Sequence, residues 1–371
     1  MHSKDCSEPL TVRKLKSNTH IKKSLSEAQK SLSLILTETL VNTSLSYFPH
    51  LSSFKYHMQV IPILALSPCG AFIASGSADG TIKVSNFQEQ NADFILIGSS
   101  GSICSIAFSP DGNNLVCGYE CNLVEIWNFK QKFLEFSVKG LSNCFQRVAF
   151  SPDGKFIAFL ARDCIAIWNF IDRKEEFKLY GHRKAVRSIV YSADGRYLVS
   201  GSNDKSIIVW NLEEKRQEFR LWGHTQVICA VAVSNNVKLI ASASYDKSLF
   251  LWSTDRHRFE FSFKFCNIVR CVSFSADDNY LVSGSDDCII RVWNITTREI
   301  CFVISTENSR IYSVFFSFDQ KTLYAGCSNS KLNIWKIYLK KMRIAPKKIL
   351  IDVSKIAISR DSKFIALAVK Y

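Results

Sequence analysis

The stretch SIVYSADGRYLVSGSNDKSIIVWN, residues 188–211, decides the fold, because it is one clear copy of a pattern that recurs along the chain. The next copy, AVAVSNNVKLIASASYDKSLFLWS, occupies residues 230–253 and lies 42 residues further on. Six copies carry a tryptophan near their end, at intervals of 41 or 42 residues: Trp127, Trp168, Trp210, Trp252, Trp293 and Trp335. Ser85 stands 42 residues before the first tryptophan, so the sequence contains seven copies.

A fixed period of this length predicts a repeat architecture, in which each unit buries its apolar face against its neighbours. Within a copy, apolar and polar residues alternate, which is the β-strand pattern. We expect strands at residues 186–192, 197–200, 206–210 and 216–222. Asp-Gly turns at 111–112, 153–154 and 194–195 separate such strands, because these residue types accept a positive φ. Four short strands per repeat predict small twisted sheets packed radially, which leaves few exposed edges.

With these features the sequence resembles the WD-repeat (WD40) β-propeller family over about residues 50–369. The resemblance implies an all-β ring of four-stranded blades around a central channel. It also implies a His/Ser/Asp/Trp hydrogen-bond tetrad that stiffens each blade. Carried over residue by residue, the tetrads are His182, Ser200 or Ser202, Asp204 and Trp210 in repeat four, and His224, Ser242 or Ser244, Asp246 and Trp252 in repeat five.

The remaining repeats depart from the tetrad pattern of the family. Repeat six has Asp287 and Trp293, but Phe265 stands where the histidine is expected. Repeat one has His57 and Asp79, with Ser85 in place of the tryptophan. Repeats two, three and seven place Cys121, Arg162 and Asn329 at the aspartate position. These departures predict blades of unequal stability within one fold.

The number of blades depends on how the two ends of the sequence are used. Residues 355–369, KIAISRDSKFIALAV, match the first two strands of an eighth unit, and TLVNT, residues 39–43, matches a third strand. With 50–55 as the fourth strand, both ends would complete an eighth blade, and we favour eight blades over seven. The alternatives are a seven-bladed ring closed by 50–55 alone, or a truncated chain. We divide the chain into a polar, basic N-terminal tail (1–38) and one propeller domain (39–371).

The net charge of +14 lies mostly near the two ends of the sequence. Residues 1–60 carry 8 Lys/Arg and 4 Asp/Glu, residues 336–371 carry 10 and 2, and the rest of the chain carries 29 and 27. Nearly neutral repeats argue against a basic propeller face that grips a nucleic acid. Residues 1–30 are polar and basic, and no run of 18 apolar residues occurs, so we expect neither a signal peptide nor a membrane span.

The 13 cysteines include no CxxC pair, and most fall in apolar, strand-like runs. Free cysteine behaves as a small buried hydrophobe, so we expect reduced thiols and an intracellular protein, cytoplasmic or nuclear. No histidine shares zinc-site spacing with a cysteine, so we expect no metal site. We also expect no cofactor, because the sequence has no GxxxxGK[ST] loop and no GxGxxG after a strand.

The sequence also argues against an enzyme. His182, Ser200 and Asp204 have the composition of a hydrolase triad, but such sets recur at one spacing in successive repeats, whereas an enzyme needs one active site. No GxSxG nucleophile elbow is present. The paired aspartates 277–278 and 286–287 lack the spacing of a calcium loop, so we interpret them as turn residues.

The segment KIYLKKMRIAPKK, residues 336–348, holds six basic residues and no acidic one. This composition suits contact with RNA, acidic lipid or an import receptor. The alternative is a solvated strand edge, where lysines guard against pairing with other chains. The motif VRKLK, residues 12–16, allows nuclear import or plain disorder in the same way.

We expect a non-catalytic protein-interaction scaffold, with an RNA-associated assembly factor that uses the basic tails as the alternative. Two positions per repeat should point to the narrow face of the ring: the residue before the turn aspartate and the second residue of the first strand. Here these are Ala78, Asn203, Tyr245 and Asp286, and Gln146, Arg187, Arg270 and Tyr312. Arg and Tyr are enriched at binding hot spots, and Arg187 and Arg270 suit an acidic or phosphorylated peptide.

Overall fold

The computed structural model describes residues 50–55, 57–86, 91–99, 101–139, 147–161, 164–306, 308–337, 353–358 and 365–369. The chain divides into two units, residues 1–336 and 337–371. Every regular element among the described residues is a β-strand, as the alternating pattern predicted. The predicted tail, residues 1–38, and the strand expected at 39–43 lie outside the described residues, so the division into tail and domain stays a prediction.

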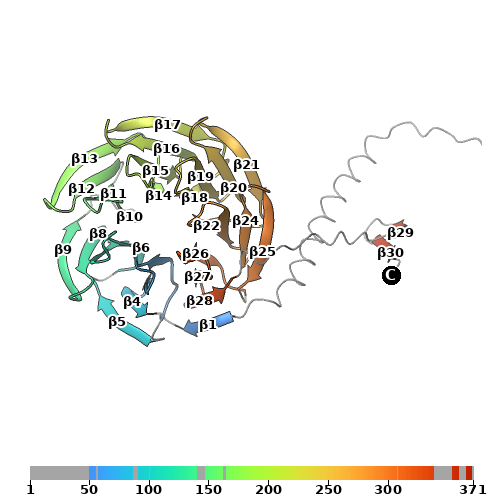
Figure 1. Cartoon of the computed structure of the whole chain (residues 1–371), viewed down its shortest axis with the longest axis horizontal. Helices are drawn as coiled ribbons and strands as arrows, with labels where there is room; N and C mark the ends of the chain where they lie inside the picture. Colours follow the sequence, from blue (N-terminus) through green and yellow to red (C-terminus); the bar gives the residue numbers. More distant parts are fainter. Residues whose placement is uncertain are drawn as a thin grey trace, which may run out of the picture. The chain divides into compact units, whose positions relative to one another are not determined.

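The larger unit is a ring of four-stranded antiparallel blades (Figure 1). Blade 1 comprises β2 (Ile63–Leu66), β3 (Phe72–Gly76), β4 (Thr81–Asn86) and β5 (Asn91–Ile97). Blade 2 comprises β6 (Ile103–Phe108), β7 (Asn114–Tyr119), β8 (Leu123–Asn128) and β9 (Phe133–Lys139). Blade 3 comprises β10 (Val148–Phe150), β11 (Phe156–Ala161), β12 (Cys164–Asn169) and β13 (Lys174–Tyr180).

The strands of blades 4 to 6 continue the same order around the ring. Blade 4 comprises β14 (Val186–Tyr191), β15 (Tyr197–Ser202), β16 (Ser206–Asn211) and β17 (Arg216–Trp222). Blade 5 comprises β18 (Ile228–Val233), β19 (Leu239–Ser244), β20 (Ser248–Ser253) and β21 (Arg258–Lys264). Blade 6 comprises β22 (Val269–Phe274), β23 (Tyr280–Ser285), β24 (Ile289–Asn294) and β25 (Glu299–Ser305). The four strands expected in the fourth repeat are confirmed within two residues at each end.

The ring has seven blades, so the eight-blade prediction is wrong. Blade 7 comprises β26 (Ile311–Phe316), β27 (Thr322–Cys327), β28 (Lys331–Lys336) and β1 (His50–Lys55). β1 pairs antiparallel with β28, with His50 opposite Trp335 and Phe54 opposite Leu332. Because β1 occupies the outer edge of β28, the seventh sheet is complete without an eighth unit. This is the alternative in which residues 50–55 alone close the ring.

The smaller unit contains the two strands expected at residues 355–369. β29 (Val353–Ile358) and β30 (Ile365–Val369) pair antiparallel in a two-stranded sheet. They therefore form a hairpin instead of half of a blade.

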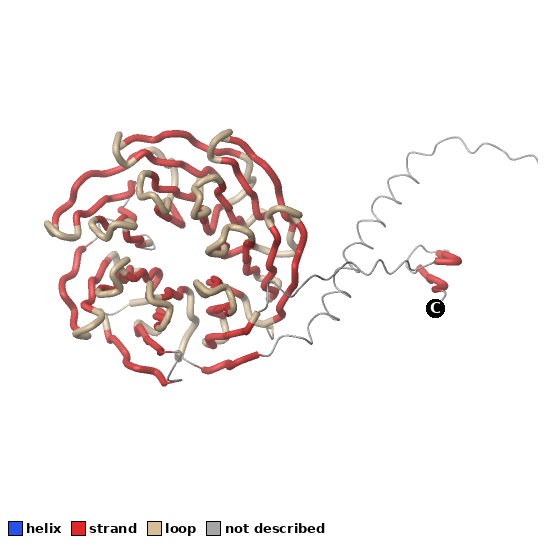
Figure 2. The backbone as a smooth tube through the Cα atoms, in the orientation of Figure 1, coloured by secondary structure: helices blue, strands red, loops and turns tan. Residues whose placement is uncertain are grey.

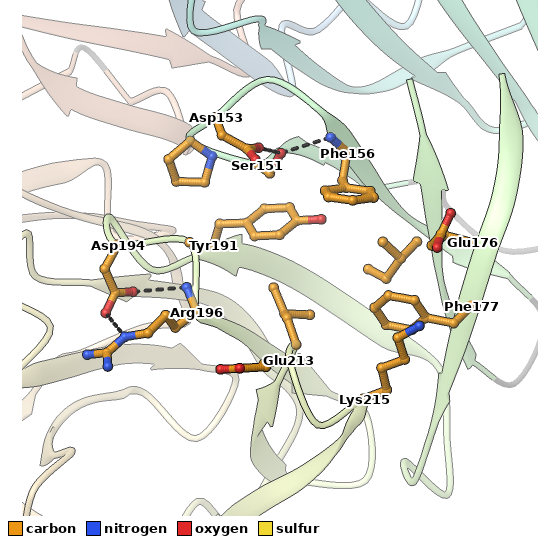
Figure 3. A pocket seen from close by; sticks show the side chains of 14 residues that line it. Ser151, Asp153, Phe156, Glu176, Phe177, Tyr191, Asp194, Arg196, Glu213 and Lys215 are labelled. Atoms are coloured by element: carbon orange, nitrogen blue, oxygen red, sulfur yellow. Dashed lines mark hydrogen bonds and ion pairs between the residues drawn. The ribbon is translucent and has the colours of Figure 1, made fainter. Parts of the chain in front are cut away.

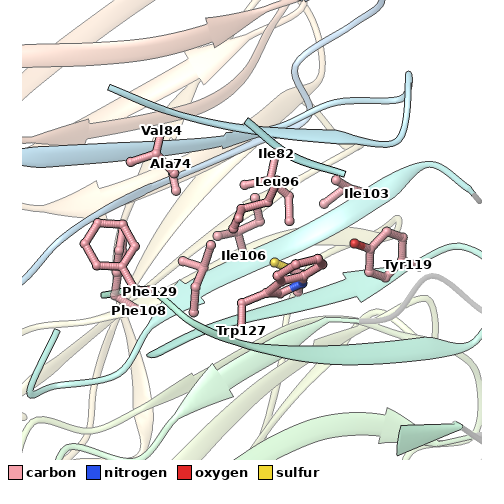
Figure 4. Close-up of a cluster of buried hydrophobic side chains, with 12 residues drawn as sticks. Ala74, Ile82, Val84, Leu96, Ile103, Ile106, Phe108, Tyr119, Trp127 and Phe129 are labelled. Atoms are coloured by element: carbon pink, nitrogen blue, oxygen red, sulfur yellow. The ribbon is translucent and has the colours of Figure 1, made fainter. Parts of the chain in front are cut away.

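The hydrophobic core consists of clusters that each join two neighbouring blades, as expected for a repeat whose units bury one another. The cluster in Figure 4 places Ile82 and Leu96 of blade 1 against Ile103 and Trp127 of blade 2. A similar cluster closes the ring, where Leu332 of blade 7 packs with Ile61, next to blade 1. The tube view in Figure 2 shows the strands following one another around the ring, with loops at both of their ends.

The turns between the first two strands of blades 2, 3 and 4 have the sequence Ser-x-Asp-Gly. In blade 4 the Ser192 hydroxyl donates to Asp194, and the Tyr197 amide donates back to Ser192 Oγ (2.9 Å). Gly195 completes the turn with a φ of 70°. The equivalent glycines at 112 and 154 have φ values of 69° and 72°, which confirms the predicted positive-φ turns.

Candidate protein-binding site

One end of the blades collects the residues that the sequence predicted for partner binding. In successive blades the turn between the second and third strands donates a backbone hydrogen bond to the segment before the first strand. Examples are Asn203 N to Ala185 O and Tyr245 N to Val227 O, both 2.9 Å. The first strands lie next to the centre of the ring (Figure 1). This repeated bond therefore brings the two predicted positions of each blade together around the ring axis.

Two of the predicted arginines bind the predicted turn residue of their own blade. Arg187 Nε donates to Asn203 Oδ1 at 2.9 Å in blade 4. Arg270 donates through Nε and Nη2 to both carboxylate oxygens of Asp286 in blade 6. All four residues are half-buried. The pKa of Arg270 is raised, first by its hydrogen bonds to Asp286. The bidentate pair therefore holds a permanently charged guanidinium in one orientation.

Two of the predicted tyrosines flank this ion pair. The Arg270 guanidinium lies 5.8 Å from the ring centroid of Tyr245 and 5.1 Å from that of Tyr312. Ala78 is half-buried on the same end of blade 1, where its amide donates to Val60 O (3.1 Å). Gln146, the position predicted in blade 3, lies outside the described residues.

Sequence reasoning missed a third arginine, Arg147, which follows the predicted position by one residue. Its Nη1 donates to Cys104 O (2.7 Å) and its Nε donates to Arg187 O (3.1 Å), so its side chain spans from blade 2 to blade 4. Burial lowers the pKa of Arg147, and Arg187 lowers it further. The strand β10 is shorter than the first strands of blades 4 and 6 and begins after Arg147. No other feature of the sequence marks this residue.

Arg147 Nε donates to the Arg187 carbonyl, and Arg187 and Arg270 hold the same position on the first strands of blades 4 and 6, which lie next to the centre of the ring (Figure 1). Cys229 holds this position on the first strand of blade 5, between them. Burial raises the pKa of Cys229 to about 12, although Arg270, Arg187 and Arg147 each act to lower it. We call Arg147, Arg187 and Arg270 the arginine cluster.

The tetrad residues of blades 4 and 5 lie within hydrogen-bond distance of one another. His182 Nδ1 is 2.9 Å from Asp204 Oδ2, its Nε2 is 2.8 Å from Ser200 Oγ, and Trp210 Nε1 donates to the same Oγ at 2.8 Å. The equivalent distances in blade 5 are 2.8, 2.7 and 2.8 Å, between His224, Asp246, Ser242 and Trp252. Of the alternative serines, Ser202 and Ser244 instead donate to the backbone before the first strand.

Hydrogen bonds lower the pKa of these aspartates by more than burial raises it. Burial alone would raise the pKa of Asp204, but bonds from His182 and Ser206 hold that pKa well below its usual range. The same balance in blade 1, with bonds from Thr81 and the Met58 amide, lowers the pKa of Asp79 to about 2. The buried aspartates therefore remain ionised at neutral pH.

Blade 1 retains the histidine and aspartate without a tryptophan. His57 Nε2 lies 2.8 Å from Ser75 Oγ, and its Nδ1 lies 3.0 Å from Thr81 Oγ1 and 3.3 Å from Asp79 Oδ2. Burial lowers the pKa of His57 despite the nearby Asp79 carboxylate. His57 is therefore a buried, neutral imidazole at pH 7.

In blade 6 an arginine, Arg291, contacts the tetrad aspartate in place of the histidine. Trp293 Nε1 still donates to Ser283 Oγ at 2.9 Å. Asp287, the predicted tetrad aspartate, forms an ion pair with Arg291 at 2.8 Å. The Arg291 guanidinium lies 4.9 Å from the centroid of Phe265, the residue that stands in place of histidine. In blade 6 a cation from the third strand thus contacts the aspartate that a histidine contacts in blades 4 and 5.

Blade 2 contains a buried network that sequence reasoning missed. Glu125, fully buried on β8, accepts from Tyr119 Oη at 2.6 Å and from Trp127 Nε1 at 3.2 Å. It also accepts from the amide of Ser99 (3.1 Å) and from the Ser99 hydroxyl. Burial, Cys117 and the Glu125 carboxylate raise the pKa of Tyr119 far above its usual range, so its hydroxyl stays a donor. The feature of the sequence that could have indicated this network is a charged residue, Glu125, two positions before the repeat tryptophan Trp127.

In blade 3 the departure has no such compensation in the described part of the chain. Cys121 is exposed, and Arg162 lies outside the described residues. In blade 3 Phe159 stands opposite Ala166, where the matching serine of blade 4 stands opposite Ile208. The Trp168 indole N–H there is buried and has no hydrogen-bond partner. Asn329 accepts the Lys331 amide (3.1 Å) as a turn residue.

Among the described residues no group of three His, Cys, Asp or Glu side chains is placed to hold a metal ion. No described helix is long and apolar enough to cross a membrane. Most of the basic segment 336–348, on which the RNA-associated alternative depends, lies outside the described residues, and the comparisons below give that alternative no support.

Comparison with known proteins identifies the family. The WD domain, G-beta repeat model matches residues 49–85 and 92–128, and the model described as the IFT122 first beta-propeller matches residues 144–370. WD repeat-containing protein 91 of Gallus gallus is 29% identical over 77 residues, which is 21% of this chain and 10% of that protein. Cell division control protein 4 of Candida albicans is 34% identical over 64 residues, 17% of this chain and 9% of that protein.

A third relative is Nuclear distribution protein nudF of Aspergillus niger, 37% identical over 60 residues, 16% of this chain and 14% of that protein. The chain thus matches 9 to 14% of the length of these relatives. The matched residues are part of a propeller, and the family models together cover most of the ring. The chain belongs to the WD-repeat β-propeller family, in the group described as the IFT122 first beta-propeller.

Proposed function

We propose that this protein is a non-catalytic interaction scaffold that binds an acidic or phosphorylated segment of a partner protein at the arginine cluster. WD-repeat propellers typically act as protein-interaction scaffolds, and the chain belongs to that family. The observation that carries the proposal is the position of three arginines at one end of the first strands: Arg187 and Arg270 lie near the start of β14 and β22, and Arg147 donates to the Arg187 carbonyl. Fold alone does not name a partner, so the chemistry of this cluster must do so.

Charge balance in the cluster favours an anionic partner. Asp286 neutralises Arg270, whereas Arg147 donates to backbone carbonyls and has no ion pair among the described residues. Guanidinium groups match carboxylates and phosphates in shape, and their bonds to these groups are among the stronger hydrogen bonds in proteins. A phosphate placed near the ring axis would therefore receive donors that the fold has already oriented.

The flanking aromatic residues add contact area to this surface. Tyr245 and Tyr312 are half-buried beside Arg270 and belong to the residue types enriched at binding hot spots. Asn203, which accepts from Arg187, offers an amide for hydrogen bonding to a peptide backbone. The cluster thus combines charge, aromatic surface and neutral polar groups.

The Ser–His–Asp sets support a scaffold and not an enzyme. In blades 4 and 5 the serine Oγ is already the acceptor of a tryptophan N–H, and Ser200 is fully buried. A nucleophile has to reach its substrate, which this serine does not. Because the described cysteines are free thiols, we also propose an intracellular location, cytoplasmic or nuclear.

Peptide binding tests the proposal. The full chain is screened against an array of phosphoserine peptides, each beside its unphosphorylated form, and the best binder is measured by fluorescence anisotropy. We expect Arg187→Gln combined with Arg270→Gln to weaken binding about tenfold or more, because each removes a charge-assisted bond. A version that also carries Asp286→Asn separates loss of the cations from exposure of that carboxylate.

The matched control is Lys205→Gln combined with Lys247→Gln. It also removes two positive charges, from exposed turns at the same end of the blades. We expect this control to weaken binding by about twofold or less, since exposed charges contribute little. An equal loss in both double variants, or no preference for phosphorylated peptides, would contradict the proposal.

A further inference from the structure

A pocket of about 600 Å³ lies between blades 3 and 4, at the strand ends opposite the arginine cluster. It is bounded by the turns at 151–153 and 194–196, by β13 and by the turn at 212–215. Arg187 lies near the start of β14 and Tyr191 ends the same strand, so the cluster and the pocket are at opposite ends of blade 4. Figure 3 shows the Tyr191 ring crossing the middle of this pocket.

The hydroxyl of Tyr191 is a buried polar group without a partner. The residue is 8% exposed, and its Oη has no hydrogen-bond partner among the described residues. Burial raises the pKa of Tyr191 far above its usual range, and the Asp153 carboxylate raises it further, so the group stays a neutral phenol. An unsatisfied buried hydroxyl costs folding free energy, which binding a ligand can recover.

The hydroxyl is specific to this blade. The matching last residue of the first strand is Phe108, Phe150, Phe274 and Phe316 in blades 2, 3, 6 and 7. Phe108 and Phe150 pack edge-on against Phe129 and Phe170. In blade 4 the residue that matches these two is Leu212, which lines the pocket. The fold therefore accommodates phenylalanine at this position, and blade 4 is the blade that has tyrosine there.

The pocket walls are apolar and its rim is acidic. Phe156, Ile167, Phe177 and Leu212 form the walls. Four carboxylates, Asp153, Glu176, Asp194 and Glu213, and two cations, Arg196 and Lys215, also line it. Arg196 pairs with Asp194 at 2.9 Å, and the Lys215 ammonium lies 4.9 Å from the Phe177 ring centroid.

Two of the acidic residues at the rim differ from their sequence neighbours in their ion pairs. Neither Glu176 nor Glu213 takes part in an ion pair within the part of the chain that the structure describes. Their sequence neighbours differ, because Glu175 pairs with Lys178 at 3.0 Å and Glu214 pairs with Arg216 at 2.5 Å. These two exposed glutamates line the same pocket as the Tyr191 phenol, whose oxygen is unsatisfied.

We propose that this pocket binds an arginine side chain presented by a partner protein. The aliphatic stem of the arginine lies between Phe156, Phe177 and Leu212, which removes apolar surface from water. Its guanidinium donates to the Tyr191 oxygen and to the carboxylates of Glu176 and Glu213. Arginine suits this site better than lysine, because a planar group with five donors reaches several acceptors at once and is less strongly hydrated.

This site goes beyond the proposed function, since it lies at the other ends of the strands and takes a ligand of opposite charge. An acidic segment at the arginine cluster and an arginine in this pocket are separate contacts. Failure of one leaves the other untouched, and the variants that test them share no residue.

The probe is the capped tripeptide acetyl-Gly-Arg-Gly-amide, titrated into the full chain and followed by saturation-transfer NMR. The citrulline and lysine analogues are titrated in parallel. We expect saturable binding of the arginine probe and about tenfold weaker binding of the citrulline analogue, which keeps the shape but lacks the charge. Lysine should lie between the two.

Three variants locate the binding. Glu176→Gln combined with Glu213→Gln should weaken binding of the arginine probe about tenfold, whereas the control Glu175→Gln combined with Glu214→Gln should change it by about twofold or less. Tyr191→Phe should weaken binding about fivefold while the melting temperature stays equal or rises, because an unsatisfied hydroxyl is lost. That combination is not expected of a residue with a purely structural role.

The assignment is overturned by any of three results: no saturable binding of the arginine probe, equal binding of the arginine and citrulline probes, or equal losses in the two glutamine double variants. Full retention of binding in Tyr191→Phe overturns the role of the phenol.

Discussion

Blades 4 and 5 and blade 2 solve the same problem with different residues. In blades 4 and 5 a histidine bridges a serine and an aspartate, and the serine accepts the tryptophan N–H. Blade 2 has Ser99, Cys117 and Cys121 at the histidine, serine and aspartate positions, yet its tryptophan N–H is also satisfied. Glu125 supplies the acceptor from the middle of the sheet.

The difference shows that the position two residues before the tryptophan can supply a charged side chain to the blade network. Blades 4 and 5 have Ile208 and Phe250 there, which are apolar because the histidine and aspartate already satisfy the network. Blade 2 has Glu125 and blade 6 has Arg291, and both lack the histidine. In these two blades a charged side chain on the third strand accompanies the missing imidazole, whereas blades 3 and 7 have Ala166 and Asn333 at this position. Blade 1 has both His57 and a charged residue there, Lys83.

The largest expected effect is loss of a tryptophan from a complete network. Trp210 is 1% exposed and donates to Ser200, so Trp210→Ala should lower the free energy of unfolding by about 3–5 kcal/mol. Trp168 of blade 3 is half-buried and its N–H has no acceptor, so Trp168→Ala should cost less. Denaturant unfolding of both variants measures the difference.

Lys184→Ala is the control, since this lysine is exposed in the loop before β14. We expect a change within about 0.5 kcal/mol. Equal costs for the two tryptophan variants would show that the hydrogen-bond network adds nothing to burial of the ring.

The next largest loss of stability is expected from removing Glu125, the hydrogen-bond acceptor of the blade 2 network. Glu125→Ala leaves the hydroxyl of Tyr119, the indole of Trp127 and both donors of Ser99 without a partner, so it should cost about 3 kcal/mol. Glu120→Ala, on an exposed turn of the same blade, should be nearly neutral. Thermal unfolding monitored by circular dichroism checks both. If Glu125→Ala is as stable as the wild type, Glu125 does not replace the tetrad.

A smaller loss of stability is expected from a substitution at Gly98, whose backbone lies next to Tyr119 and Glu125. A Cβ on Gly98 would collide with Tyr119 Oη and lie 2.6 Å from Glu125 Oε2, so Gly98→Ala should cost about 2 kcal/mol. Tyr119→Phe removes the colliding oxygen, so the double variant should recover part of the loss relative to the sum of the two single changes. Strictly additive costs in this double-mutant cycle would mean that Gly98 and Tyr119 are not in contact.

The smallest expected effect is a pH dependence from blade 1. The folded pKa of His57 lies below its ordinary value of 6.5, mainly through burial, so the unfolded chain binds this proton more readily. The contribution of neutral His57 to stability is therefore present above pH 6.5 and is lost as the pH falls through the folded pKa. The stability gap between wild type and His57→Gln should narrow from pH 7.5 to pH 5.5. A gap that stays constant or widens contradicts a lowered pKa.

The sequence was enough to predict the fold, because the period and the Ser-x-Asp-Gly turns are local features that repeat. It also identified the residues of the blade 4 and 5 networks, which keep constant offsets from the tryptophan. Blade number was harder. Residues 50–55 fit the last strand of either a seventh or an eighth blade, and only the pairing of His50 with Trp335 decides between them.

The rest depends on contacts between distant residues. Glu125 reads as an ordinary polar residue in a strand until Ser99 and Tyr119 are brought to it. Arg147 enters the arginine cluster because its bonds reach Cys104 and the backbone of Arg187, some 40 residues away in each direction. No offset within one repeat encodes such contacts between blades.

The proposed scaffold role is tested most directly by proximity labelling in cells. The full chain, the Arg187→Gln and Arg270→Gln double variant, and the Lys205→Gln and Lys247→Gln control are each fused to a biotin ligase, and the labelled neighbours are quantified. We expect a group of neighbours rich in acidic or phosphorylated segments that is lost from the arginine variant and retained by the lysine control. The same neighbours in all three samples would contradict a partner surface at the arginine cluster.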